Sequence, residues 1–163
     1  GFVRAGCARG VPMGGDLKAA TGKAPTFMVM ASMDPKSGNL DRIQIVKGWL
    51  DAKGRQHERI YDVVWSGERK LDPKTGKLPP VGDTVDATKG DYVNSIGAAE
   101  LATAWVDPDF DPSLRAFYYA RVIEIPTPRW STRDAARLGM PIPKGLPVSI
   151  QERAWTSPIW YTP

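Results

Sequence analysis

This chain has very little of what thiol, disulfide and metal chemistry require. Its 163 residues include one cysteine, Cys7, and one histidine, His57. A single cysteine excludes an internal disulfide, and the usual zinc sites need several Cys, His or carboxylate ligands that converge. No catalytic motif surrounds either residue, so we expect Cys7 to be a small packing residue and His57 an exposed residue at the start of a strand. We therefore predict no metal site, no cofactor and no catalytic residue in this chain.

Long apolar runs and clusters of one charge sign are also missing. No run approaches the ~18 apolar residues of a transmembrane helix, so we expect no membrane partner. The net charge is +4, but no stretch holds five Lys or Arg together, which argues against nucleic acid as a partner. No signal peptide is recognisable and the first residue is not Met, so we interpret the chain as a fragment or a processed product. The compartment stays open, with a periplasmic or secreted parent as one option.

What the chain does have is turn residues and short apolar runs. Sixteen Gly and fifteen Pro interrupt it too often for long helices. Between them, strand-like patterns predict strands over 26–32, 40–50, 59–65, 100–106, 115–125 and 150–161. The last of these is expected to be bulged or to end near Pro158. Ile43, Ile45 and Trp49 alternate onto one face of the second of these. Ser131 or Thr132 is expected to N-cap a short helix.

These elements favour a mainly β fold. About six or seven strands with turns between them, and no alternation of strands with helices, are typical of an antiparallel β-sandwich of the immunoglobulin-like type. The one short helix is expected to run through Leu138, to end at Gly139, and to lie in the loop before the last strand. We assign residues 1–25 to a Gly-rich N-terminal arm or junction and residues 26–163 to the sandwich domain.

Two groups of carboxylates are candidates for a calcium site or for an acid–base pair. Asp107, Asp109 and Asp111 have the alternating spacing that opens a calcium loop, but the loop's Gly and distal Glu are missing, so a turn is favoured. Glu124 and Glu152 lie on strands that we expect to be neighbours. For these two, charge pairing across the sheet with Arg121 and Arg153 is favoured over an acid–base dyad.

Tryptophan supplies the one surface candidate. Trp49, Trp65 and Trp105 fall on the apolar faces of their strands and are expected in the core. Trp130 instead follows Arg129 in a Pro-rich segment, where a large ring either docks on the domain or is presented to a partner. We therefore take four residues as candidates for a ligand or interdomain contact: Arg129, Trp130, Asp134 and Arg153.

Four motifs resemble a known family. The segments 10–17, 47–51, 125–132 and 151–161 together resemble the C-terminal part of a bacterial family known only as domain of unknown function 3604. The resemblance covers nearly the whole chain. It implies a longer protein in which a PHP-like, metal-dependent α/β barrel precedes a region like this one and carries the metal ligands. Nothing here matches the ligand motifs of that barrel, so no catalytic residue is carried over.

Two functions remain open. The first is a non-catalytic C-terminal β-sandwich portion of a larger, metal-dependent hydrolase-like protein. Its role would be structural or would shape the active site through the 126–148 loop, with the N-terminal barrel as partner. The alternative is a module that binds a saccharide or an anionic small molecule through the same loop. A self-contained enzyme is disfavoured, because no nucleophile, base and orienting group match. An isolated fragment is also expected to self-associate through an apolar face or an edge strand.

Overall fold

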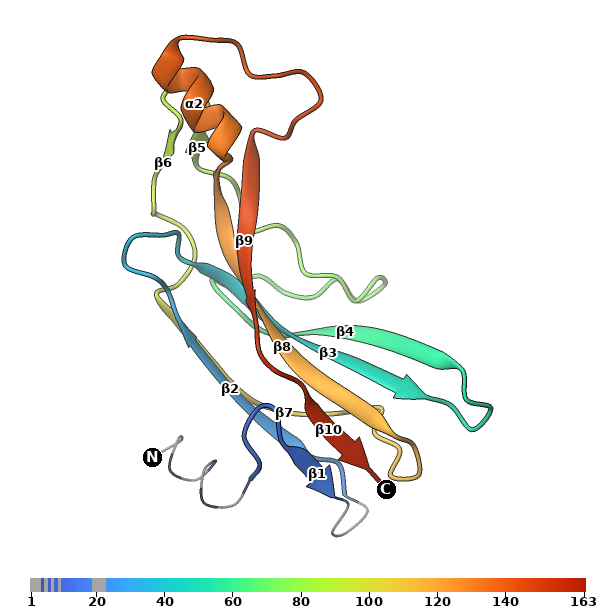
Figure 1. Ribbon diagram of the computed structural model, residues 1–163. Coiled ribbons are helices and arrows are strands. Elements are labelled where there is room, and N and C mark those ends of the chain that lie inside the picture. Colours follow the sequence, from blue (N-terminus) through green and yellow to red (C-terminus); the bar gives the residue numbers. More distant parts are fainter. Residues whose placement is uncertain (1–3, 5, 7, 9, 19–22) are drawn as a thin grey trace.

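The computed structural model describes residues 4, 6, 8, 10–18 and 23–163, so the prediction for Cys7 lies outside the described residues. Its elements are β1 (Asp16–Lys18), β2 (Thr26–Ser32), β3 (Leu40–Leu50), β4 (Gln56–Trp65), β5 (Val85–Asp86), β6 (Asp91–Tyr92), β7 (Glu100–Val106), β8 (Ala116–Pro128), α2 (Trp130–Leu138), β9 (Ser149–Trp155) and β10 (Ile159–Thr162). The expected mainly β fold with a short helix ahead of the last strands is confirmed (Figure 1). The immunoglobulin-like connectivity stays a prediction.

The main sheet is built around β8. The strand order is β1-β10-β8-β3-β4, and β9 pairs with the second half of β8. All of these pairs are antiparallel except β1 with β10. The strand predicted over 150–161, with a bulge or an end near Pro158, is divided into two strands. It breaks into β9 and β10 around Pro158, which has no N–H to donate to a ladder.

A second layer covers one face of this sheet. The antiparallel ribbon β2–β7 packs against it, and the ring of Phe27 lies 4.4 Å from that of Tyr118. The core between the layers is formed by Phe27, Leu40, Ile43, Ile45, Leu101, Ala116, Tyr118, Ala120 and Tyr161. Trp49 and Trp105 pack on its margin as expected, whereas Trp65 is half-buried and donates to the carbonyl oxygen of Arg69 over 2.7 Å.

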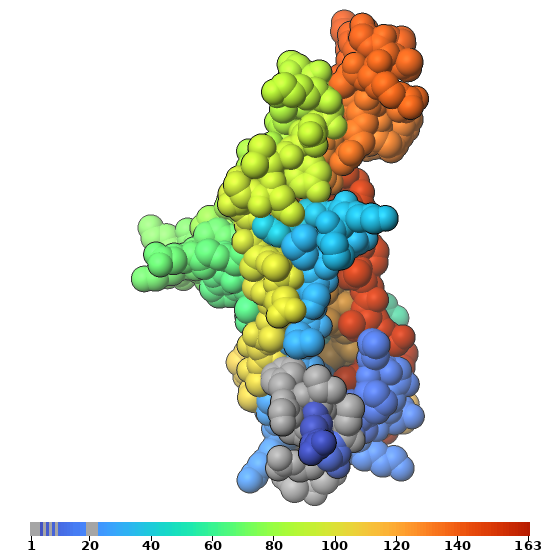
Figure 2. Space-filling model, turned by 90° about the vertical axis from the view of Figure 1, so that its left-hand side faces the viewer, coloured from blue at the N-terminus to red at the C-terminus, as the bar shows by residue number. Residues whose placement is uncertain are grey.

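The other face of the sheet is exposed near β10 and β4. Leu50, Ile60 and Trp160 on this side are each more than two-fifths exposed. We call this side the open face. At the far end of the molecule the β8–β9 hairpin extends beyond the sheet and carries α2, with β5 and β6 beside it (Figures 1 and 2). No helix in the described part of the chain is long and apolar enough to cross a membrane.

Candidate functional site

The start of α2 differs from its prediction. The helix begins at Trp130 with Arg129 as N-cap, and no side chain caps it. Thr132 Oγ1 instead donates to the carbonyl oxygen of Val148 over 2.7 Å, which ties the helix to the start of β9. The predicted capping by Ser131 or Thr132 is therefore wrong, because this contact holds the threonine hydroxyl and the serine hydroxyl is buried. The predicted stop at Gly139 is confirmed by a left-handed φ of 64°.

The helix buries its small residues and exposes its large ones. Its buried residues are Ser131, Thr132 and Ala135. The packing is tight on this side, since a Cβ placed on Gly90 would lie 2.9 Å from the Cα of Arg133. Trp130 is 66% exposed and Leu138 is 62% exposed. The helix therefore turns its largest apolar side chains away from its own domain.

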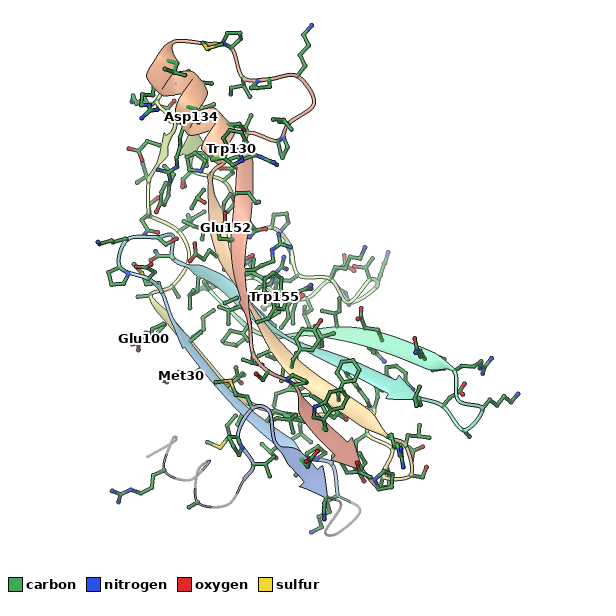
Figure 3. All side chains as sticks on the ribbon, in the orientation of Figure 1. Met30, Glu100, Trp130, Asp134, Glu152 and Trp155 are labelled. Carbon is green, nitrogen blue, oxygen red and sulfur yellow. The ribbon has the colours of Figure 1, made fainter. Side chains whose placement is uncertain are left out.

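The loop after α2 continues this apolar surface. We call residues 129–148 the α2 lobe. Its exposed large apolar residues are Trp130, Leu138, Met140, Leu146 and Val148. Clusters of exposed apolar side chains are typical of surfaces that contact another molecule or domain. Asp134, exposed on the same helix, lies 3.9 Å from Arg137 and adds a charged group to this surface (Figure 3).

Three of the four predicted contact residues come together and one does not. Arg129, Trp130 and Asp134 lie in the α2 lobe. Arg153 lies on β9 opposite Ile123 and donates to the carbonyl oxygen of Gln151. At ~3.3 Å per strand residue, the five positions from Val148 to Arg153 place it roughly 16 Å from the lobe.

The predicted charge pairing of Glu124 and Glu152 is wrong. Among the described residues neither carboxylate takes part in an ion pair. Glu124 accepts a hydrogen bond from Ser37 over 2.6 Å, and Arg121 donates to Gln44. The cause is the strand register, which sets Arg121 opposite Trp155 and Arg153 opposite Ile123, so that neither arginine faces a glutamate.

A buried polar cluster joins the two layers. Lys47 Nζ lies 2.6 Å from Asp107 Oδ2 and donates to the carbonyl oxygen of Asp109 over 2.7 Å. Tyr118 donates to the same Asp107 carboxylate, and burial together with this bond raises the pKa of the Tyr118 hydroxyl. The Lys47 amine thus occupies the position beside Asp107 and Asp109 that a calcium ion would need. The described residues hold no group of three or more His, Cys, Asp or Glu side chains arranged for a metal.

His57 is a partly exposed strand residue. Its ring stacks on that of Trp49 with centroids 5.2 Å apart, and its Nε2 lies 3.1 Å from Asp51 Oδ2. The contact spans the turn between β3 and β4. It gives the imidazole a structural partner at the edge of the sheet.

The open face contains a groove that was not predicted from the sequence. It has a volume of about 720 Å³ and lies where β1, β10, β8, β3 and β4 run side by side. Its lining includes Asp16, Glu58, Arg115, Phe117 and Trp160. These residues come from four separate stretches of sequence, and only the strand register brings them together. Asp16 and Trp160 both fall in segments that resemble the family, but neither segment by itself indicates a groove.

Comparison with known proteins gives a family and no function. The model of the family described as "Protein of unknown function (DUF3604)" matches residues 1–163. No curated protein and no solved structure matches the chain. Because the family model covers the chain from end to end, the motifs singled out above lie within one family unit. The chain belongs to the DUF3604 family of proteins of unknown function.

Proposed function

We propose that this chain is a non-catalytic β-sandwich portion of a larger, metal-dependent hydrolase-like protein, and that its α2 lobe contacts the barrel of that protein. The role is structural: the lobe holds the two parts together and helps to shape the mouth of the barrel's active site. The resemblance described above supplies the partner, and the lobe supplies the contact surface.

One observation carries this proposal. α2 buries Ser131, Thr132 and Ala135 and exposes Trp130 and Leu138. An isolated domain gains no stability from this inverted arrangement, since burying large apolar side chains is what stabilises a fold. The arrangement becomes stabilising when a second folded part covers the exposed Trp130 and Leu138 side chains. Arg129 and Asp134 then supply polar contacts at the margin of an apolar centre, which is the usual composition of an interface.

The test uses the full-length polypeptide that contains this chain. We expect the double variant Trp130→Ser, Leu138→Ser to weaken the contact between the parts. Amide hydrogen exchange across residues 129–148 should then rise at least several-fold relative to the unmodified protein. A matched control is Met30→Ser, an exposed apolar residue on β2 that lies well away from α2 (Figure 3).

Three results would contradict the proposal. The first is equal exchange of the α2 lobe in the full-length protein and in the isolated chain, since that means that nothing covers it. The second is hydrolase activity of the isolated chain. The third is self-association of the isolated chain through the lobe that persists in the full-length protein, because the lobe would then bind a second copy instead of the barrel.

A second candidate function rests on two buried atoms. Arg129 Nε and Ser131 Oγ are buried without a hydrogen-bond partner among the described residues. A buried donor without a partner costs about 1–3 kcal/mol, and a bound acceptor would remove that cost. This favours the binding of a saccharide or an anionic small molecule at the start of α2. Titration of Arg129→Met and of the unmodified chain with inorganic phosphate and with a neutral disaccharide tests it, and equal responses of the two proteins would reject it.

A further inference from the structure

The groove on the open face is built from one row of register partners. Asp16 pairs with Trp160, Trp160 with Phe117, Phe117 with Gly48, and Gly48 with Glu58. Residues that face each other across neighbouring strands project on the same side of a sheet. One line across five strands therefore presents a carboxylate at each end, two aromatic rings between them, and a glycine whose missing side chain makes room for the second ring.

Gly48 shapes this row. A Cβ at this position would lie 2.3 Å from Cζ of Phe117, so the phenyl ring lies across the bare backbone of β3. Trp160 stands next to it, with ring centroids 5.4 Å apart and the planes inclined at 55°. Trp160 is 49% exposed. The Trp160 and Phe117 rings therefore form an accessible aromatic surface within the groove.

The polar groups around these rings are free to bind. Asp16, Glu58 and Arg115 are all exposed, and among the described residues none of them forms an ion pair. Gln56 also lines the groove. Carboxylates only accept hydrogen bonds, a guanidinium only donates them, and an amide does both. The groove thus combines acceptors at its two ends with donors along one side.

We infer that this groove binds a neutral oligosaccharide. A sugar ring has an apolar face that stacks on an aromatic ring and an edge of hydroxyls that both donate and accept, which is the combination found here. Five neighbouring strands span about 19 Å, enough for more than one sugar ring. The volume of about 720 Å³ lies in the range of ordinary ligand sites. Two carboxylates against one guanidinium disfavour a polyanionic sugar by Coulomb repulsion.

The test uses the full-length protein and three neutral probes: cellotetraose, xylotetraose and mannotetraose. Calorimetry and tryptophan fluorescence should show binding of at least one of them. Trp160→Ala should weaken that binding about tenfold, the size expected for a lost stacking contact. Trp155→Ala is the matched control, because Trp155 is also an exposed tryptophan, at 58%, and it does not line the groove. Its binding should equal that of the unmodified protein.

If Trp160→Ala fails to fold, Glu58→Ala provides a second test of binding in the groove. Glu58 is exposed at the end of the row, so its replacement leaves the packing of the sheet intact and should still weaken binding several-fold. Failure of all three sugars at millimolar concentration would overturn the inference. Equal losses in Trp155→Ala and Trp160→Ala would place the site elsewhere. Binding of tetragalacturonate or of spermine, with no neutral sugar bound, would also overturn the inference and would show that the groove takes a charged ligand. None of these results bears on the α2 lobe, which lies at the other end of the molecule.

Discussion

Single residues decide what the two faces of the main sheet present. Gly48 is the clearest case, because β3 is otherwise a strand of large side chains, and the missing Cβ is what allows the Phe117 ring to cross it. Lys47, its neighbour, points to the other side and is 4% exposed. Successive residues of a strand alternate in this way between faces. One position therefore serves the groove and the next serves the buried polar cluster.

Gly48→Ala is expected to destabilise the fold by about 1–3 kcal/mol, the usual cost of forcing an extra group into a packed site. The reason is the 2.3 Å approach of Phe117 Cζ to the added Cβ. Urea unfolding measures the change in the free energy of unfolding. In a Phe117→Ala background the same substitution should cost much less, because the obstructing ring is gone. An equal cost in both backgrounds would show that the strand tolerates no Cβ there for another reason.

At the level of elements, the strands followed from local pattern, but β4 begins at Gln56 instead of residue 59 and β8 runs to Pro128 instead of residue 125. The limits predicted for β2, β3 and β7 agree with the structure. The β3–β4 turn also forms as its Asp-Ala-Lys-Gly sequence indicates, with Gly54 at a φ of 76°. The Asp51 carboxylate accepts backbone hydrogen bonds from Lys53 and Arg55 in this turn. This turn carries the end of β4 that lines the groove.

The Asp51 turn is expected to make this hairpin sensitive to acid. The backbone N–H of Arg55, the His57 side chain and further hydrogen bonds hold the pKa of the Asp51 carboxyl well below its usual value of 3.8. A pKa lowered by folding means that the charged form stabilises the folded state above pH 3.8 and that this contribution is lost as the pH falls below that value. Carboxyl-carbon NMR titration should give a midpoint below 3.8. Asp51→Asn should remove the acid-induced loosening of the turn, and a normal midpoint would contradict this account.

At the scale of the whole molecule, the two layers are joined by more than apolar contact. Asp107 follows β7 in the outer ribbon, and Lys47 lies on β3 in the main sheet. Their ion pair is enclosed, with side-chain exposures of 5% for Lys47 and 0% for Asp107. Such a pair is costly to bury, but it is costlier still to break once buried. It therefore fixes how the ribbon sits on the sheet.

Lys47→Met is expected to destabilise the protein by about 3–5 kcal/mol, because it leaves the Asp107 carboxylate buried without its partner. The double variant Lys47→Met, Asp107→Asn should lose less, since neither charge is then stranded. Chemical denaturation of the two proteins and of the single Asp107→Asn variant completes the cycle. A double variant that is as unstable as the sum of the single ones would show that the two charges act independently.

The class of this fold and most of its strands follow from local features of the amino-acid sequence. Alternating side chains, turn residues and the helix stop at Gly139 are local signals, and local sterics and burial act on them directly. The family also follows from sequence alone, as the match over residues 1–163 shows. The same local signals brought Arg129, Trp130 and Asp134 to notice, and all three lie in one lobe.

The surfaces that those elements form depend on how the strands pair in three dimensions. The register of β8 against β9 depends on long-range pairing, and it sets Arg121 opposite Trp155 and Arg153 opposite Ile123 instead of opposite a glutamate. The groove depends entirely on such pairing: Asp16, Glu58, Phe117 and Trp160 become neighbours only through the strand register. Hydrogen bonds between strands distant in the chain carry no local signature. For that reason a pattern read along one strand cannot reveal a site that runs across five.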